Sequence, residues 1–168
     1  MRTSLVVSTN STILHTYVHS NRMPHCGTDI IECMANSDNV IRAGLTPKLR
    51  DVPNLVNTLT YVAAPATHHT VKPQPFPHAS ASTLYDPPIS EFSVVSVTLA
   101  LRKTEVHRAL GGPSIAIVAG GEGKLRWGDG SFEITKGEAV FISAGTAVNL
   151  SATGSGEELQ IYRAFVEA

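Results

Sequence analysis

The amino-acid sequence predicts a mainly β protein whose second half folds as an antiparallel sandwich or barrel. From residue 84 onward, short runs rich in β-branched and aromatic residues recur at regular spacing, separated by glycine turns. Evenly spaced short strands of this kind are typical of antiparallel all-β domains. The strands expected on this basis are 92–99, 114–118, 124–127, 131–134, 139–142 and 158–165.

Alternation along these strands predicts which side chains fill the core. Because successive residues of a strand point to opposite faces, we expect one set of apolar residues from these strands to face inward. The inward-facing residues predicted in this way are Val94, Ile115, Ile117, Phe141 and Ile161.

One helix is expected before the strands. Asp51 can cap its free amides, and Pro53 is tolerated in a first helical turn. Apolar residues then recur at helical spacing, which favours packing against a core over a partner-binding face. These residues are Leu55, Val56, Leu59 and Val62.

Composition divides the chain into segments. Residues 1–28 contain no acidic residue, and we expect them to be a poorly ordered lead-in that belongs to no compact core. Residues 65–83 hold four prolines and predict an extended linker, whose histidines are better explained as surface residues than as metal ligands. The β-rich domain is expected to span 84–168, which leaves 29–64 as a separate segment carrying the helix.

Bulk properties exclude several classes of partner. The 168 residues carry a formal net charge of −1 without a cationic block, which argues against nucleic acid and anionic membranes as partners. No apolar run approaches the roughly 18 residues that span a bilayer. Cys26 and Cys33 stand seven apart, a spacing that suits neither a metal knuckle nor a disulfide framework. Reduced thiols indicate a cytoplasmic protein, and the oligomeric state stays open.

The most unusual stretch is 32–48, where two acids, two asparagines and two cations stand among apolar residues. Arg42 and Lys48 are six apart, so a helix would not hold them on one face, but Gly44 and Pro47 can bend the chain between them. A bent backbone could aim both cations at one phosphate or developing oxyanion. The alternative is a solvated loop with incidental charges.

This stretch resembles a signature of type I mannose-6-phosphate isomerases. The match is ungapped from 29 to 61 and centres on SDNVIRAGLTPK at 37–48. By position, the resemblance implies that Arg42 is the catalytic arginine and that Lys48 lines the pocket for the sugar phosphate. It also implies that 29–64 is the tail of a catalytic domain.

Zinc is the cofactor that the resemblance implies for the full-length family. The family's ligands are a glutamine, a glutamate and two histidines, mostly from an N-terminal region without a counterpart here. One of these histidines follows a proline shortly before the position of Asp29, and this chain offers Pro24-His25. The interval is two residues shorter than in the family, so His25 is either a displaced metal ligand or a coincidence. We expect this chain not to bind zinc stably.

A second resemblance concerns the C-terminal domain. Residues 137–148 are similar to the second motif of cupin jelly rolls, but Ser143 stands in place of that motif's proline, and Val148 in place of its metal-binding histidine. The first motif, with its HxH and its downstream glutamate, is absent altogether, and His107 is alone on its stretch. A lone imidazole cannot complete a zinc site. The resemblance therefore implies a cupin-like jelly-roll barrel without metal, such as type I isomerases carry at their C-terminus.

Two functional hypotheses follow. In the first, the chain is the C-terminal part of an enzyme that interconverts mannose 6-phosphate and fructose 6-phosphate for GDP-mannose synthesis, inactive without the missing ligands. In the second, it is a non-catalytic cupin-like module or relic that binds an intact isomerase. An independent metal-dependent cupin, such as a dioxygenase, is disfavoured by the absent HxH motif.

Overall fold

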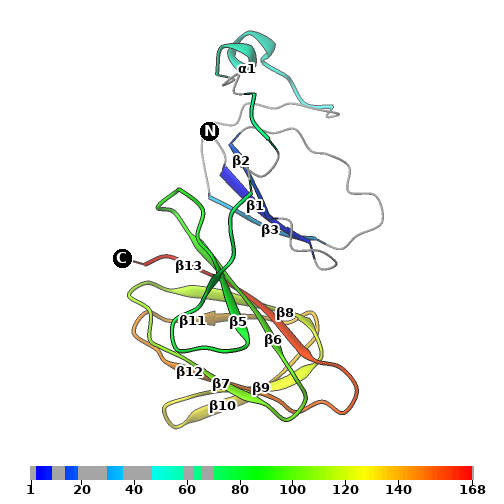
Figure 1. Ribbon diagram of the computed structural model, residues 1–168, viewed down its shortest axis with the longest axis vertical. Coiled ribbons are helices and arrows are strands. Elements are labelled where there is room, and N and C mark those ends of the chain that lie inside the picture. Colours follow the sequence, from blue (N-terminus) through cyan, green and yellow to red (C-terminus); the bar gives the residue numbers. More distant parts are fainter. Residues whose placement is uncertain are drawn as a thin grey trace. The chain divides into compact units, whose positions relative to one another are not determined.

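The computed structural model describes residues 3–8, 14–18, 30–35, 47–58, 63–65 and 70–167 (Figure 1). The chain separates into two compact units, Met1–Val71 and Lys72–Ala168. The second unit is called the β-domain below.

Three strands form a small antiparallel sheet in the first unit. These are β1 (Thr3–Ser8), β2 (Leu14–Val18) and β3 (Ile30–Met34), in the order β2-β1-β3. Two of them come from 1–28, where we expected a lead-in outside any compact unit. The apolar run in β1 pairs with β3, with Val7 opposite Ile31, since β-branched residues suit a pleated sheet.

The predicted helix is confirmed as α1 (Val52–Thr58). Asp51 caps it, because its carboxylate accepts a hydrogen bond from the backbone N–H of Asn54 at 3.2 Å and another from the Asn54 side-chain amide at 2.6 Å. Leu55 is half-buried and Val56 is 47% exposed, while Leu59 and Val62 lie outside the described residues.

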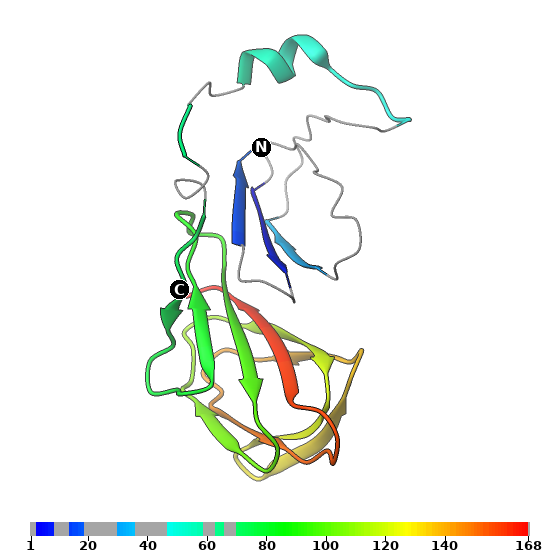
Figure 2. The ribbon, with the colours of Figure 1, turned by 45° about the vertical axis from the view of Figure 1, so that its right-hand side comes forward.

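The β-domain consists of two antiparallel sheets, as the strand pattern predicted. The larger contains β4 (Gln74–Pro75), β5 (Ser82–Tyr85), β6 (Ser93–Leu99), β8 (Ser114–Gly120), β11 (Ala139–Ile142) and β13 (Leu159–Phe165), in the order β11-β8-β13-β6-β5-β4. The smaller contains β7 (Thr104–His107), β9 (Glu122–Trp127), β10 (Gly130–Thr135) and β12 (Val148–Ala152), in the order β10-β9-β12-β7. In Figure 2, β5, β6 and β13 lie side by side in green and red. The described strands leave the two sheets separate, so the jelly roll is an open double sheet, within the sandwich-or-barrel class that the sequence predicted.

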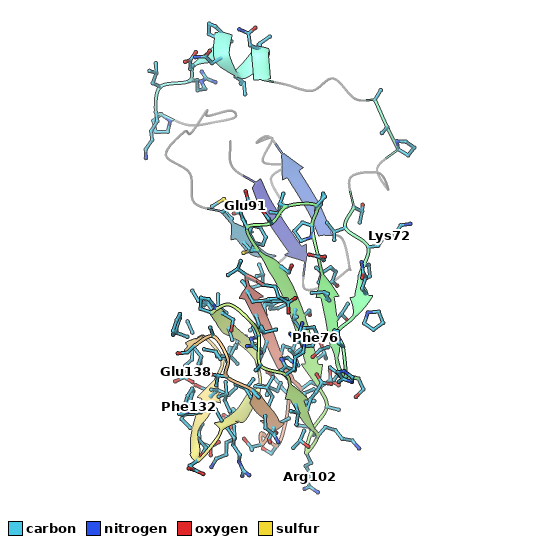
Figure 3. The ribbon with its side chains drawn as sticks, turned by 90° about the vertical axis from the view of Figure 1, so that its left-hand side faces the viewer. Lys72, Phe76, Glu91, Arg102, Phe132 and Glu138 are labelled. Atoms are coloured by element: carbon cyan, nitrogen blue, oxygen red, sulfur yellow. The ribbon has the colours of Figure 1, made fainter. Side chains whose placement is uncertain are left out.

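Apolar side chains from both sheets form one core cluster between them. It includes Phe76, Val95, Val97, Leu99, Leu125, Ile134, Ile142, Leu150, Leu159, Ile161 and Phe165. Phe76 is labelled within the domain in Figure 3, and its ring meets that of Phe165 edge-on at 6.4 Å between centroids. Phe76 and β4 fall within the segment 65–83 that we predicted to be a linker, so this part of it belongs to the β-domain.

The predicted register of β8 and β11 was wrong by one residue. Ile115, Ile117 and Phe141 are 53%, 41% and 67% exposed, whereas Ala116, Val118 and Ile142 are buried. The inward position next to them in β8 is Ser114, whose hydroxyl accepts a hydrogen bond from buried Arg163. Because side chains alternate, an inward Ser114 places Ile115 and Ile117 on the outer face.

The other two predicted core residues differ in their surroundings. Ile161 is 2% exposed and belongs to the core cluster, as predicted. Val94 is also 2% exposed but lies outside that cluster. It pairs with Ala164 and Tyr85, which share the outer face of the larger sheet. Val94 is therefore buried on the opposite side from the one we predicted.

Candidate functional site

Two of the three predicted site residues, Arg42 and His25, lie outside the described residues. Lys48 is described, and its side chain is exposed in a bend that follows Pro47. The catalytic, metal-binding and substrate-binding roles assigned from the signature therefore stay predictions.

A cluster of buried polar and charged side chains lies within the β-domain. Its members are Ser82 on β5, Glu105 and His107 on β7, Ser114 on β8 and Arg163 on β13. All five are buried, with exposed fractions between 0% and 6%. We call this set the Arg163 cluster.

Glu105 is the acceptor at one end of the cluster. Its carboxylate accepts hydrogen bonds from the backbone N–H groups of Ser80 at 2.7 Å and Ala81 at 2.5 Å, and a short one from the Ser82 hydroxyl. Burial acts to raise the pKa of Glu105, but these bonds and one from His107 hold it below its ordinary value. Glu105 is therefore an anion at neutral pH.

His107 links the two ends. Its Nε2 lies 2.9 Å from the Ser82 hydroxyl and 3.2 Å from Glu105, and its Nδ1 lies 3.4 Å from the guanidinium of Arg163. A guanidinium can only donate, so Nδ1 accepts and the ring proton is on Nε2. Burial first, and then the charge of Arg163, lower the pKa of His107, although Glu105 acts to raise it. The imidazole is thus neutral at pH 7.

Arg163 closes the cluster at the other end. Its Nε donates to the hydroxyl of Ser114 at 2.9 Å. Burial, followed by repulsion from Arg108, lowers its pKa to about 10, so the guanidinium stays charged at neutral pH. The cluster is therefore a chain of carboxylate, neutral imidazole and guanidinium, in which a buried cation and a buried anion compensate through the imidazole.

The geometry of the Arg163 cluster is not that of a nucleophile. In a serine–histidine–acid triad the acid orients the imidazole through the nitrogen that does not face the serine. Here Ser82 and Glu105 both contact Nε2, and Arg163 occupies the other side. The burial of every member also denies access to a substrate. The cluster therefore stabilises the contact between the strands that supply it.

Sequence reasoning missed Glu105 and the strand that carries it. A signal was present, because Glu105 and His107 are two apart and so share one face of a strand. We had taken His107 to be isolated. Their partners Ser82 and Arg163 come from distant parts of the chain, 25 and 56 residues from His107, and only the folded sheets bring them together.

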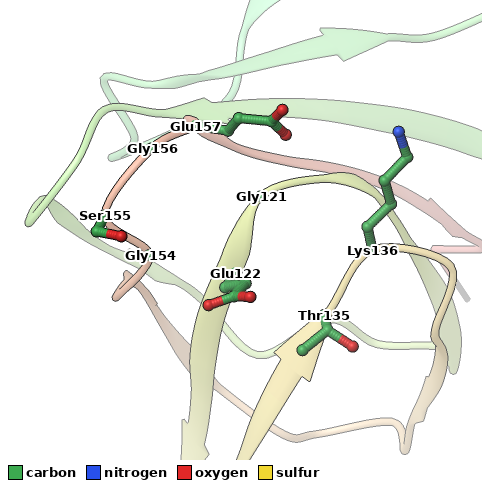
Figure 4. Close-up of a pocket in the computed structure, with 8 residues that line it drawn as sticks. All are labelled: Gly121, Glu122, Thr135, Lys136, Gly154, Ser155, Gly156 and Glu157. Atoms are coloured by element: carbon green, nitrogen blue, oxygen red, sulfur yellow. The ribbon is translucent and has the colours of Figure 1, made fainter.

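The described surface has shallow hollows. One, of about 330 Å³, is lined by Gly121, Glu122, Thr135, Lys136, Gly154, Ser155, Gly156 and Glu157 (Figure 4). Glu122 at the start of β9, Lys136 in the turn after β10 and Glu157 in the loop before β13 line it, so two carboxylates and one ammonium border the hollow. This excess of negative charge disfavours a phosphate, so the hollow does not replace the predicted sugar-phosphate pocket.

Folded in this way, the β-domain is a cupin-like double-sheet domain of the jelly-roll class. Residues 82–130 match the family model for the C-terminal domain of type I phosphomannose isomerases. The chain is 48% identical over 141 residues to a mannose-6-phosphate isomerase from Cryptococcus neoformans, and 43% identical over 157 residues to one from Schizosaccharomyces pombe. These matches cover 83% and 91% of this chain.

Solved structures agree with the sequence matches. A crystal structure of a point mutant of phosphomannose isomerase from Salmonella typhimurium superposes with a TM-score of 0.68 at 31% identity over 83% of this chain. A zinc-bound mannose 6-phosphate isomerase gives a TM-score of 0.67, also at 31% identity over 83% of the chain. Over most of its length, the chain is thus similar to part of a type I phosphomannose isomerase, and its β-domain to the family's C-terminal domain.

The matched part is a minor portion of those relatives. The chain spans about a third of their length, both for the curated proteins and for the solved structures. Within the described residues, no helix has the length and apolar character that a membrane crossing requires.

Proposed function

We propose that this chain is the C-terminal portion of a mannose-6-phosphate isomerase and that it acts together with the part of the enzyme that it does not span. The observation that carries the proposal is the 48% identity to a mannose-6-phosphate isomerase over 83% of the chain. The reaction is the interconversion of mannose 6-phosphate and fructose 6-phosphate, which moves a proton between two neighbouring carbons of a sugar phosphate.

In this proposal Arg42 and Lys48 have separate roles. The guanidinium of Arg42 offsets the negative charge that builds up on the sugar oxygens during proton transfer, because a fixed cation stabilises a developing oxyanion. Lys48 holds the phosphate as a compact point charge. The signature at 37–48 supports both assignments.

The described residues do not fit a zinc ion. They contain no group of three or more histidine, cysteine or acidic side chains placed to hold a metal. Glu105 and His107 lie together, but Ser82 and Arg163 already use their polar atoms. The zinc of the related holo structure therefore enters no step proposed for these residues.

The second candidate is a non-catalytic module that binds an intact isomerase. The sealed Arg163 cluster and the absence of a metal-binding group among the described residues favour it over independent catalysis. The two candidates differ in whether this chain contributes to turnover.

A complementation assay tests the proposal. The upstream part of the Cryptococcus neoformans enzyme, ending where the match to this chain begins, is assayed for fructose 6-phosphate formation alone, mixed with this chain, and fused to it. We expect turnover with this chain and none from either part alone. A folded, zinc-loaded fusion without turnover would favour the module. Turnover by this chain alone would show that it is a complete enzyme.

A further inference from the structure

The two sheets of the β-domain have different outer faces. On the smaller sheet the outward positions include four charged residues, Glu122, Lys124, Arg126 and Glu133, as expected for a surface in water. The outward positions of the larger sheet carry no charged residue along β5, β6, β8, β11 and β13. They are Thr83, Tyr85, Val94, Ser96, Thr98, Ile115, Ile117, Ala139, Phe141, Gln160, Tyr162 and Ala164.

The uncovered part of this neutral face lies on β8 and β11. Phe141 pairs directly with Ile115, and Ile117 pairs with Ala139 on one side and Tyr162 on the other. Phe141, Ile115 and Ile117 are 67%, 53% and 41% exposed, and we call these three residues the Phe141 patch. Neighbouring large apolar side chains this exposed mark an interaction surface.

A hollow extends the patch at its edge. It measures about 390 Å³ and is lined by Phe132, Glu138, Ala139, Val140 and Phe141. Figure 3 labels Phe132 and Glu138 at the same end of the β-domain. The hollow offers an apolar partner side chain a place to insert beside Phe141.

The Phe141 patch lies at an edge of the larger sheet, and this position also supports its role as an interaction surface. β11 is an edge strand of the larger sheet and pairs with β8 alone among the described strands. Natural proteins protect exposed edges with charges, prolines or a covering element. At the opposite edge β4 carries Pro75, whereas β11 presents Phe141. An apolar edge of this kind favours association with another surface.

The relatives contain a further part that could cover this edge. They are about three times as long as the matched stretch, and that stretch includes the domain that the family model names as C-terminal. In so long a chain, the part that precedes a C-terminal domain is tethered to it and so is available as a packing surface at high effective concentration. The neutral patch matches an apolar surface on that part better than a charged one.

We propose that the Phe141 patch is the surface through which this β-domain docks on the upstream, catalytic part of a mannose-6-phosphate isomerase. This inference rests on the proposed function, since it takes the isomerase as the partner. A second copy of this chain is the competing occupant.

The test measures binding between this chain and the upstream part of the Cryptococcus neoformans enzyme, produced separately, by isothermal titration calorimetry. The double variant Phe141→Ser with Ile115→Thr should bind at least about tenfold more weakly, because truncating aromatic anchors removes most of the energy of an interface. The matched control is Val106→Thr on β7, whose side chain is 55% exposed on the outer face of the smaller sheet. It should bind within about twofold of the unchanged chain. Circular dichroism confirms that each variant is folded, and Ile117→Thr replaces the double variant if that does not fold.

Three binding outcomes overturn the inference. If the double variant binds as tightly as the unchanged chain, docking occurs elsewhere on the molecule. If the control variant weakens binding as much as the double variant does, the loss of binding is not specific to the Phe141 patch. If the chain alone forms a dimer in sedimentation that the double variant abolishes, a second copy is the occupant. Turnover separates this inference from the proposed function. Turnover that the double variant leaves intact at limiting chain concentration refutes docking through the patch, whereas patch-dependent binding without turnover refutes the function alone.

Discussion

Arg163 and His107 lie side by side in the core of the β-domain, with a guanidinium nitrogen 3.4 Å from Nδ1 of the imidazole. This contact fixes the tautomer of His107 and points its Nε2 proton toward Ser82 and Glu105. The ring of Phe76, 5.0 Å away between centroids, closes the apolar side of the imidazole. A protonated His107 would place a second buried cation beside Arg163, so the cluster is stable only with a neutral imidazole.

This relationship predicts how stability depends on pH. The pKa of His107 is lowered on folding, so below its ordinary value of about 6.5 the unfolded chain binds more protons at this residue than the folded one. The free energy of unfolding should fall as pH drops from about 7 toward 5, by up to about 1.4 kcal/mol per pH unit from this residue. Urea titrations followed by the fluorescence of Trp127, the chain's one tryptophan, report on the β-domain.

The variant His107→Gln supplies the control for this measurement. Gln cannot take up the proton, so its titrations should show a shallower dependence on pH across the same window. The same slope for both chains would mean that other groups cause the effect.

A second prediction uses two neighbouring residues of β11. Ile142 is 5% exposed and belongs to the core, whereas Phe141 is 67% exposed. Ile142→Ala should lower the free energy of unfolding by about 2–5 kcal/mol, and Phe141→Ala by less than about 1 kcal/mol. Denaturant titration of the two variants compares them directly. If Phe141→Ala lowers the free energy of unfolding more than Ile142→Ala does, Phe141 faces the core, as the sequence predicted.

A third prediction concerns where the β-domain begins. A chain starting at Lys72 keeps β4, Phe76 and the Ser82 contact to Glu105, whereas one starting at Leu84 loses all three. The longer form should melt cooperatively. The shorter form removes the Ser80, Ala81 and Ser82 donors to Glu105 and should melt broadly or stay unfolded, as scanning calorimetry would show. Equal cooperativity in both forms would make residues 72–83 dispensable.

Metal content provides a fourth prediction. Equilibrium dialysis followed by elemental analysis should find well under about one zinc per chain, because the described residues offer no group of three ligands. His25 is the sequence's remaining candidate ligand. Stoichiometric zinc that disappears in His25→Ala would contradict the prediction and make His25 a ligand.

The fifth prediction separates Arg42 from Lys48 in a fusion with the upstream part of a related isomerase. Arg42→Ala should lower kcat by about 10²–10³-fold, the usual cost of losing one oxyanion donor, and Arg42→Lys should restore little of it. Lys48→Ala should act mainly on KM, because a phosphate away from the reacting carbons is held about equally in ground and transition states. If Arg42→Ala turns over at the unchanged rate with zinc fully bound, Arg42 has no catalytic role and is an incidental charge on a solvated loop.

The sequence by itself indicated the resemblance to the isomerase family, the β class and six of the ten described strands of the β-domain. The signature at 37–48 is a contiguous string of residues, so it can be recognised without a fold. Glycine turns and β-branched runs gave six of the strands, and Asp51 with Pro53 gave the start of α1, because turn and capping preferences act between residues close in the chain.

Tertiary structure decided which face of each strand turns inward. Hydrophobicity favours Ile115 over Ser114 for the core, yet Ser114 faces inward, where it accepts a hydrogen bond from Arg163 on a strand 49 residues away. Tertiary structure also placed β4 and Phe76 in the β-domain and brought Ser82 within hydrogen-bond distance of Glu105. These outcomes depend on which distant strands become neighbours, and a buried charge then selects the register because leaving it unpaired costs more than exposing an isoleucine.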